Sequence, residues 1–547
     1  MTDNGRTTSV WMGANETRDE SPLLLDAHAD VCIVGAGIAG LTTAYLLALD
    51  GRRAIVVDDG PTAGGETCRT TAHLVSALDD RFYQLERLHG AQGARLAAQS
   101  HESAIDQIER IVRDEKIDCD FARVDGYLFV PLGDDLAQLD RELQAAHRAG
   151  LTGVSRVDRA PVASFDTGPA LRFPHQGQFH VMKYLRAVAD AAKRAGAQIY
   201  NGTRVTRIEG GKSALVETNR GVIHAGAIVV ATNSPINDLV AIHTKQAAYR
   251  TFVVGARVRR NSLPRILLWD TPDPYHYVRI HQVRPGERVD RMRPAQPEGY
   301  DVLIVGGEDH KTGQANDAEE RFERLEAWTR ERFGEIREFE YRWSGQVMEP
   351  VDGLALIGRN PLDHDNVYIA TGDSGNGMTH GTIAGMLLTD LIVGRENPWA
   401  GLYDPARKSL GAIKEFAKEN LNVAVQYADL FTPGEVSDVG EVKPGEGAIL
   451  RRGAAKVAVY RDEHGELHER SAFCTHLGCV VRWNSLERTW DCPCHGSRFQ
   501  IDGHAVNGPA IVALKAVGET VDDHHGREDF SPAKQTAAAS REARRRD

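Results

Sequence analysis

The 547-residue chain is poor in cysteine and has no long apolar run. Three of its seven cysteines, Cys32, Cys68 and Cys119, lie far apart in the sequence, so a framework of disulfide bonds is not expected. No apolar run approaches the roughly 18 residues that a membrane-spanning helix needs. The N-terminus has no basic start followed by an apolar core, which argues against a signal peptide. We therefore expect a cytoplasmic protein with no membrane partner.

Basic residues are fewer than acidic residues, 65 against 77, so the formal net charge is -12. This balance argues against nucleic acid as a partner, and the basic ending "REARRRD" is interpreted as a solvated tail. Residues 1–24 and 525–547 lack apolar periodicity and are expected to be disordered and flexible, respectively. Hydrophobic residues make up 41% of the chain and charged residues 26%, which is typical of a globular protein.

A nucleotide-binding pattern occupies the stretch "ADVCIVGAGIAGLTTAYLLALDGRRAIVVDDG". Its apolar residues predict a strand over 31–34, a helix over 41–49 and a second buried strand over 54–57. The turn between the first strand and the helix carries the G-x-G-x-x-G spacing. Strand, turn, helix and second strand agree with one another, so the pattern indicates a dinucleotide site within a Rossmann-like fold.

Each residue of the motif has a physical task. Gly35 permits the tight turn, Gly37 lets the backbone approach a pyrophosphate, and Gly40 lets the helix pack closely on the strand. The helix N-terminus offers unpaired N–H groups to the pyrophosphate. Asp58 ends the second strand, where its carboxylate can accept hydrogen bonds from the ribose hydroxyls.

Further segments resemble the D-amino-acid-oxidase-like flavoprotein family, which includes glycine and sarcosine oxidases. They are "GGETCRTTAHL", "RVDGYLFVP", "GAQIYNGTRVTRI", "GVIHAGAIVVATNS" and "VYIATGDSGNGMTHGTIAGMLLTDLIVG". The resemblance implies FAD as cofactor and, over residues 25–420, an FAD-binding domain interleaved with an α+β substrate domain. It also implies further cofactor-binding residues: Thr70, Thr71, Val205, Ala231, Gly372, Gly375, Gly377 and Met378.

Two departures from the family pattern stand near the implied flavin. "ATNS" replaces the glycine that many relatives have after "AT", and Cys68 occupies a loop position. Cys68 and His73 could attach the flavin covalently, but we expect noncovalent FAD. Trp343 and Gln346 can also approach the ring.

The chain has no second G-x-G-x-x-G, so a nicotinamide domain is not expected and the reductant should bind directly over the flavin. By resemblance it is an amine or amino acid oxidised at a C–N bond. Strand alternation in "DPYHYVRI" places Tyr275, Tyr277 and Arg279 on one side. There Arg279 would bind a carboxylate, although a surface or salt-bridge role is the alternative. His310 and Lys311 could flank the flavin or lie in a solvated loop.

A second cofactor is indicated by "CTHLGC" and "CPCHGS" near the C-terminus. Cys474 and His476 form C-x-H, and Cys492 and His495 form C-x-x-H, each on a short loop. Two thiolates and two imidazoles suit a structural zinc ion. Zinc does not require the two further cysteines of these motifs, Cys479 and Cys494. The residues therefore favour another metal centre without excluding zinc.

These two motifs resemble the Rieske [2Fe–2S] family closely, and the implied module spans residues 425–522. In such centres two cysteines hold one iron and two histidines the other, which here are Cys474 with Cys492 and His476 with His495. The resemblance also implies a disulfide and two residues that tune the cluster. Cys479 and Cys494 would form the disulfide, Ser497 would bond a sulfide, and Phe499 would replace a tyrosine donor and lower the potential.

Flavin takes two electrons as a hydride, whereas a Rieske cluster carries one, so their fusion predicts an electron splitter. The expected enzyme is an FAD-dependent dehydrogenase with an iron–sulfur outlet to an unidentified one-electron acceptor. Two other functions stay open: an electron-transfer reductase that serves a partner enzyme, and a redox sensor.

Overall fold

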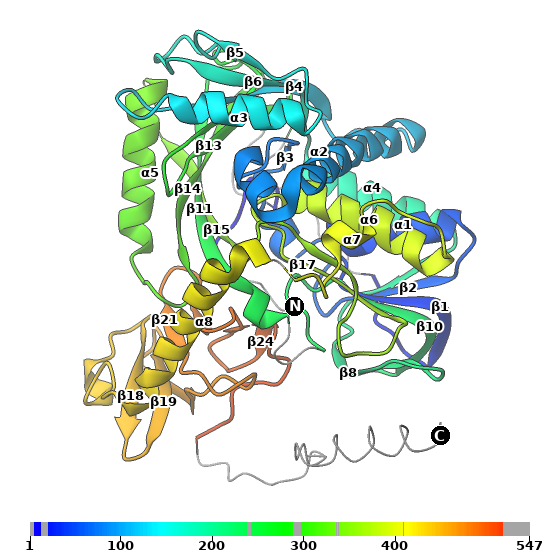
Figure 1. The fold of residues 1–547 in the computed structure, drawn as a ribbon. Helices are drawn as coiled ribbons and strands as arrows, with labels where there is room; N and C mark the ends of the chain where they lie inside the picture. The colour runs from blue at the N-terminus through cyan, green and yellow to red at the C-terminus, as the bar shows by residue number, and fades with distance from the viewer. Residues whose placement is uncertain are drawn as a thin grey trace, which may run out of the picture.

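The computed structural model describes residues 5–12, 20–237, 242–287, 297–334, 336, 338–408 and 410–517. The predicted flexible tail, residues 525–547, lies outside this range. In the described part, no helix has the length and apolar character needed to cross a membrane. Figure 1 shows a large α/β body with a smaller β body packed against one end of it.

The first sheet of the large body is parallel at its centre. Its path runs β16-β17-β10-β1-β2-β7, parallel from β17 to β7. The predicted strand, helix and second strand of the nucleotide motif are confirmed within β1, α1 and β2. The strands are β1 (Ala27–Val34), β2 (Ala54–Val57), β7 (Gln198–Tyr200), β8 (Val205–Glu209), β9 (Leu215–Thr218), β10 (Val222–Val230), β16 (Leu356–Arg359) and β17 (Val367–Thr371).

Two helices flank α1 (Ile38–Leu49) on this sheet, namely α4 (Val181–Arg194) and α6 (Gly377–Val393). Both α1 and α6 are apolar almost all round, as expected for helices buried on more than one side. Gly385 of α6 approaches Thr42 of α1 so closely that an added Cβ would lie 2.4 Å from a Thr42 side-chain carbon. This contact packs the two helices tightly against each other.

The second sheet is larger and mostly antiparallel, with the path β15-β11-β14-β13-β12-β4-β6-β3. The chain alternates between the two sheets, so the predicted interleaving of FAD and substrate subdomains is what the structure has. Its strands are β3 (His73–Leu74), β4 (Ala122–Phe129), β5 (Ser155–Val157), β6 (Ala170–Gln178), β11 (Gln246–Val258), β12 (Leu267–Asp270), β13 (Tyr277–Val283), β14 (Tyr300–Lys311) and β15 (Phe339–Pro350). Helices α2 (Phe82–Asp114), α3 (Ala137–Arg148), α5 (Ala318–Phe333) and α7 (Ala400–Tyr403) complete the body.

The smaller body contains two antiparallel sheets, which confirms an all-β C-terminal domain. Helix α8 (Ile413–Tyr427) leads into it and spans the boundary predicted between 420 and 425. One sheet consists of β18 (Gly447–Arg452), β19 (Ala455–Arg461) and β20 (Leu467–Ser471). The other consists of β21 (Arg482–Asn484), β22 (Thr489–Asp491), β23 (Arg498–Phe499) and β24 (Ala505–Asn507).

The prediction of disorder over residues 1–24 is wrong for residues 5–12, which pack between the two bodies. Trp11 is fully buried, and its indole N–H donates to the backbone oxygen of Thr70 at 2.6 Å. Thr7 donates its backbone N–H to Glu487 of the smaller body at 2.9 Å. The apolar trio "VWM" in an otherwise polar segment was the sequence signal for this anchor.

Candidate functional site

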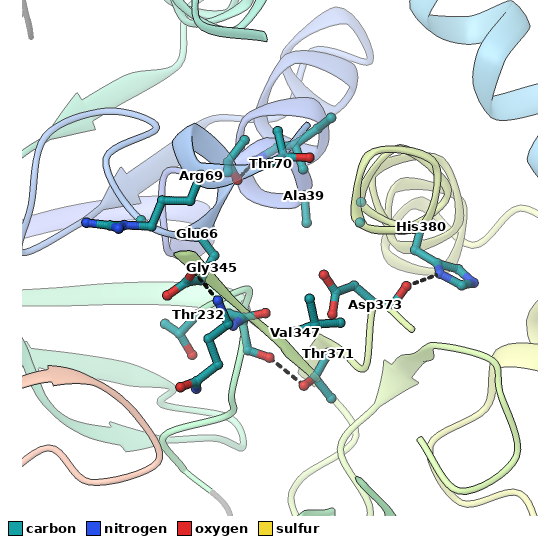
Figure 2. Close-up of a pocket in the computed structure, with 18 of the residues that line it drawn as sticks. Ala39, Glu66, Arg69, Thr70, Thr232, Gly345, Val347, Thr371, Asp373 and His380 are labelled. Atoms are coloured by element: carbon teal, nitrogen blue, oxygen red, sulfur yellow. Dashed lines mark hydrogen bonds between the residues drawn. The ribbon is translucent and has the colours of Figure 1, made fainter. Parts of the chain in front are cut away.

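One deep cavity runs from the turn after β1 to the inner face of the second sheet. Figure 2 shows part of its lining, with residues contributed by segments far apart in the sequence. The glycine turn and Asp58 lie at one end, and aromatic and acidic side chains lie at the other. The cavity therefore has a nucleotide end and a second, chemically different end.

At the nucleotide end, the glycines of the motif are required by close approach of the backbone. Gly35 has φ +110°, and a Cβ there would lie 2.4 Å from the Ala231 carbonyl oxygen. A Cβ on Gly40 would lie 1.9 Å from the Gly35 oxygen. Gly37, the N-cap of α1, has no side chain to cap the helix, and the Ile38 N–H makes a long hydrogen bond of 3.4 Å to Thr67 Oγ1. Gly37, Ile38 and Ala39 line the cavity, so this helix end suits a pyrophosphate.

Asp58 lies where the motif predicts it. Its carboxylate accepts hydrogen bonds from the backbone N–H groups of Ala36 at 2.7 Å and Gly60 at 2.8 Å. Each carboxylate oxygen can accept more than one hydrogen bond, so capacity for ribose hydroxyls remains. The residues at this end thus fit the adenosine diphosphate half of FAD.

The cavity lining includes every further residue that the family resemblance implied. All eight line it: Thr70, Thr71, Val205, Ala231, Gly372, Gly375, Gly377 and Met378. His73 and Gln346 also line it, whereas Trp343 is buried behind the wall and donates to the Arg69 carbonyl oxygen at 2.8 Å. The N-terminus of α6, which begins at Gly377, opens on this region without a side-chain cap.

The second end, here called the chamber, is lined by Asp79, Asp309, Glu349 and Asp373 together with Trp269, Tyr275 and Tyr277. The Tyr275 hydroxyl donates to Asp79 at 2.6 Å. The rings of Tyr275 and Tyr277 lie 5.5 Å apart. The Tyr277 hydroxyl lies 2.6 Å from that of Thr251. Two of the predicted substrate contacts, Tyr275 and Tyr277, therefore face the cavity.

Burial raises the pKa of these carboxyl groups. It brings the pKa of Asp79 and Asp373 to about 6 and that of Asp309 to about 7. Burial, together with repulsion from Asp80 and Asp373, holds the pKa of Glu349 well above its usual range. Each carboxylate makes its neighbours harder to ionise.

Arg279 does not enter the chamber, so its predicted role in binding a substrate carboxylate is wrong. The guanidinium lies behind the connection between β2 and β3, residues 58–72, here called the flavin loop. It donates to the backbone oxygens of Thr71, Ala72 and Phe179 at 3.1, 2.7 and 3.2 Å. It also lies over the Trp11 ring, 5.4 Å from the centroid. The surface or salt-bridge alternative is equally wrong, because Arg279 is buried and holds backbone carbonyls.

His310 and Lys311 do not flank the cavity either. His310 donates its Nδ1–H to the Lys311 carbonyl oxygen at 2.8 Å and stacks on Phe252. Lys311 pairs with Glu419 of α8. Instead it is their neighbour Asp309 that lines the chamber. A register shift in the β11–β14 pairing, next to Glu308 with φ +59°, accounts for this change of direction.

The second candidate centre lies at the tip of the smaller body. The thiols of Cys474 and Cys492 are in side-chain contact, and the His476 and His495 rings lie 5.0 Å apart. Both cysteines and His495 are buried, and His476 is half-buried. Two sulfur and two nitrogen donors thus converge from two loops, which fits a Rieske cluster.

The predicted disulfide between Cys479 and Cys494 is present and joins the two loops. The sulfur atoms of Cys479, Cys492 and Cys494 lie within 4.8 Å of one another. Two of the three are consumed by the disulfide, however, so of this group only Cys492 keeps a free thiol for a metal. Ser497 lies in hydrogen-bonding contact with Cys474, and Phe499 is fully buried.

The tip of the smaller body packs directly on the wall of the cavity. Gln346 donates its side-chain amide to the Gly496 carbonyl oxygen at 3.0 Å, one residue beyond His495. His243 of the large body lies against both histidines, with ring centroids 5.0 Å from His476 and 5.9 Å from His495. One residue, Gln346, therefore touches both the cavity and the cluster loop. Sequence reasoning missed His243, for which the sequence holds no local signal.

A set of buried charges also joins the two bodies, here called the interface charge cluster: Arg69, Arg250, Arg498, Glu66, Glu487 and Asp491. Glu487 lies 3.2 Å from Arg69 and 3.6 Å from Arg250. Arg498 lies 3.3 Å from Asp491 and 3.7 Å from Glu66. Although burial alone would raise it, the three arginines hold the pKa of Glu487 at about 2.

The smaller body also supplies part of the cavity wall. Ala505, Val506, Asn507, Gly508, Ala510 and Ile511 all line the cavity. The Asn507 amide donates to Glu66 at 3.0 Å, which ties this segment to the flavin loop. Sequence analysis did not predict this contact, because nothing local to the segment indicates where it docks.

Comparison with known proteins adds two family matches. Residues 30–391 match the model of the FAD dependent oxidoreductases, and residues 432–518 match the Rieske [2Fe-2S] domain. The chain is 30% identical over 512 residues to a Bacillus subtilis (strain 168) protein that carries the name Rieske 2Fe-2S iron-sulfur protein YhfW. This alignment covers 93% of this chain and 97% of the relative.

The large body alone has further relatives. It is 26% identical over 378 residues to the gamma-glutamylputrescine oxidoreductase of Escherichia coli (strain K12), covering 67% of this chain and 84% of that protein. The crystal structure of glycine oxidase from Geobacillus kaustophilus superposes with a TM-score of 0.56 at 18% identity. That superposition covers 70% of this chain and 99% of the glycine oxidase.

Proposed function

Because the chain belongs to the FAD dependent oxidoreductase family and carries a Rieske [2Fe-2S] domain, we propose that it dehydrogenates an amine-type substrate and sends the electrons out through its own cluster. The family domain binds FAD and the Rieske domain binds the cluster. The chemistry that these groups supply when bound is acceptance of a hydride from the carbon beside an amine nitrogen, leaving an imine that water hydrolyses, and then one-electron transfer.

The residues that would hold FAD are those at the nucleotide end and in the middle of the cavity. The α1 N-terminus behind Gly37 would bind the pyrophosphate, and Asp58 the ribose. The α6 N-terminus places the positive end of its dipole on the other half of the cavity. Tyr275 and Tyr277 would close the chamber around the substrate, which excludes water from the reacting bond.

The proposed cluster ligands are Cys474 and Cys492 on one iron and His476 and His495 on the other. The disulfide of Cys479 and Cys494 keeps the two loops together. Ser497 would donate to sulfur and Phe499 would contribute no donor, which together would set the potential within the Rieske range. Leu477, beside His476, is 37% exposed, so the outlet to an external one-electron acceptor would lie there.

The observation that carries the proposal is the contact of Gln346 with both sites. Gln346 lines the cavity and bonds to the backbone next to His495. Amino-acid substrates and amines are both compatible with the family, and the gamma-glutamylputrescine relative acts, by its name, on an amine. Neighbouring centres joined through one side chain support direct transfer inside the molecule.

Anaerobic mixing with a panel of amines and amino acids tests the proposal. We expect the flavin absorption to bleach first and the electron paramagnetic resonance signal of the reduced cluster to follow. A cluster that is reduced by a carrier protein without any change in the flavin would indicate a reductase. Failure of every substrate to bleach the flavin, with partner binding that depends on cluster oxidation, would indicate a sensor instead. Either result would overturn the proposal.

A further inference from the structure

We propose that the chamber selects a cation: its ligand carries an ammonium group and no carboxylate. This inference deepens the proposed function and rests on it for the identity of the substrate chamber. It narrows the substrate from amines and amino acids in general to cationic amines.

The first ground is the imbalance of charge in the chamber. Four carboxyl groups line it: Asp79, Asp309, Glu349 and Asp373. The basic residues of the whole cavity lining, within the described part of the chain, are Arg69, Arg204, His73 and His380. None of these supplies positive charge to the chamber, for the reasons that follow.

Both arginines are engaged elsewhere. Arg69 belongs to the interface charge cluster, and Figure 2 shows its side chain pointing away from the cavity while that of Asp373 points into it. Arg204 lies beside Val205 at the nucleotide end and pairs with Asp59 at 2.9 Å. Burial lowers the pKa of His73 to about 3 and that of His380 to about 4. Both histidines are therefore neutral at pH 7.

Two cations outside the lining face this region, and both are held by other partners. Arg81 donates to the Asp270 carbonyl oxygen at 3.2 Å. Arg321 pairs with Asp317 at 2.8 Å and donates to the Glu308 carbonyl oxygen at 2.8 Å. They moderate the negative potential but do not reach the chamber as ion-pair partners.

The second ground is independent of charge counting. Oδ1 of Asp309 is buried and has no hydrogen-bond partner among the described residues. A buried carboxylate oxygen without a donor is costly, and an ammonium N–H would satisfy it. The aromatic residues Trp269, Tyr275 and Tyr277 line the same space, and aromatic rings attract cations.

The third ground is the position of Arg279. It is the arginine that the sequence offered for a substrate carboxylate, and its guanidinium is committed to three backbone oxygens behind the flavin loop. An amino-acid carboxylate in the chamber would meet four carboxyl groups and no basic partner from the lining. Those of the four that are ionised would repel it, because like charges in a buried site repel strongly.

A matched pair of probes tests the inference on the unmodified holoprotein. The tert-butylammonium ion keeps its N–H donors but has no hydrogen on the carbon beside nitrogen, so it cannot be oxidised to an imine and reports binding alone. The compound 2-amino-2-methylpropanoate keeps the same ammonium-bearing carbon and replaces one methyl group with a carboxylate. Binding is followed by the change in the visible absorption of the flavin. We expect the cation to bind at least tenfold more tightly, and hexanoate to cause no change.

Variants locate the effect. Asp309→Asn and, separately, Asp79→Asn should each weaken binding of the cation tenfold or more and leave the zwitterion unchanged. Asp365→Asn removes the same charge from a side chain that is 95% exposed, and should have no effect. Equal or tighter binding of the zwitterion or of hexanoate would overturn the inference, as would full affinity for the cation in both chamber variants.

These outcomes are separable from failure of the proposed function. The probes bind without turnover, so the inference is tested even if no amine bleaches the flavin. Conversely, rapid bleaching by an amino acid with no binding of the cation would refute the cationic chamber and leave C–N oxidation standing.

Discussion

The molecule has two groups of buried charge, and they are built in opposite ways. The interface charge cluster sets three arginines against three carboxylates, and Glu487 at its centre is held ionised. The chamber sets four carboxyl groups against no basic residue of its own lining. A balanced group needs nothing from outside and serves to join two domains. An unbalanced group is stable only when its carboxyls take up protons or when a cation arrives, as expected of a binding site.

The largest effect should come from breaking the balanced group. Glu487→Gln leaves Arg69 and Arg250 buried without their shared carboxylate, so we expect a loss of about 3–5 kcal/mol in the free energy of unfolding. Chemical denaturation of the holoprotein measures it. Glu463→Gln is the matched control, because its pair with Arg488 is exposed and should change stability by less than about 1 kcal/mol. Similar losses in both variants would mean that the buried interface charge cluster contributes no more stability than an exposed ion pair.

The two groups should also contribute to the free energy of unfolding with opposite dependence on pH. Asp79 and Asp309 have pKa values of about 6 and 7 in the folded protein, above the unfolded value of about 4. The folded state then binds more protons, so their contribution is lost as pH rises from about 4 to 7. Glu487, with a pKa of about 2, contributes stability that is lost as pH falls from about 4 to 2.

Denaturation of the ligand-free holoprotein across pH measures both windows. Asp309→Asn should reduce the loss of stability between pH 4 and 7 and leave the loss below pH 4 unchanged. The same substitution at exposed Asp365 should alter neither. A chamber variant that loses more stability between pH 4 and 7 than the unmodified protein would contradict the assignment of raised pKa values to this group.

The smallest effect should come from Gln346, the residue that lines the cavity and bonds to the cluster loop. Gln346→Leu removes one hydrogen bond to the cluster loop, worth about 1 kcal/mol, so we expect reduction of the cluster to slow about fivefold while substrate reduces the flavin at the normal rate. Stopped-flow spectroscopy separates the two phases. Gln314→Leu is the control, because Gln314 also bonds to this loop, at the Pro493 carbonyl, but does not line the cavity. Equal slowing in both would remove the special role of Gln346.

The parts of the fold that could be predicted from sequence are those whose chemistry is local. Gly40 is fixed by its close approach to Gly35 within one turn, and the spacing of Cys474, His476, Cys492 and His495 is set by two short loops. Such patterns survive in the sequence because the residues that must cooperate are neighbours along the chain.

The parts that could not be predicted depend on irregular backbone or on distant packing. Simple alternation placed Arg279 with Tyr277, but the strand passes behind the flavin loop before it reaches Arg279. The irregular pairing near Glu308 turns Asp309 into the chamber and His310 away from it. Trp11 and Asn507 meet the cavity wall through tertiary contacts of more than 50 residues' separation, for which a single sequence holds no pattern.

The buried junction at Glu487 has a consequence for how fast electrons can leave the flavin. Swinging the iron–sulfur domain outward would expose Arg69, Arg250 and Glu487 and pull Asn507 from the cavity wall. We therefore expect the two redox centres to keep a constant separation during turnover. Electron tunnelling across a constant distance does not require diffusive motion of the domain. Electron transfer from the flavin to the cluster should therefore proceed at the same rate in viscous glycerol solution as in buffer.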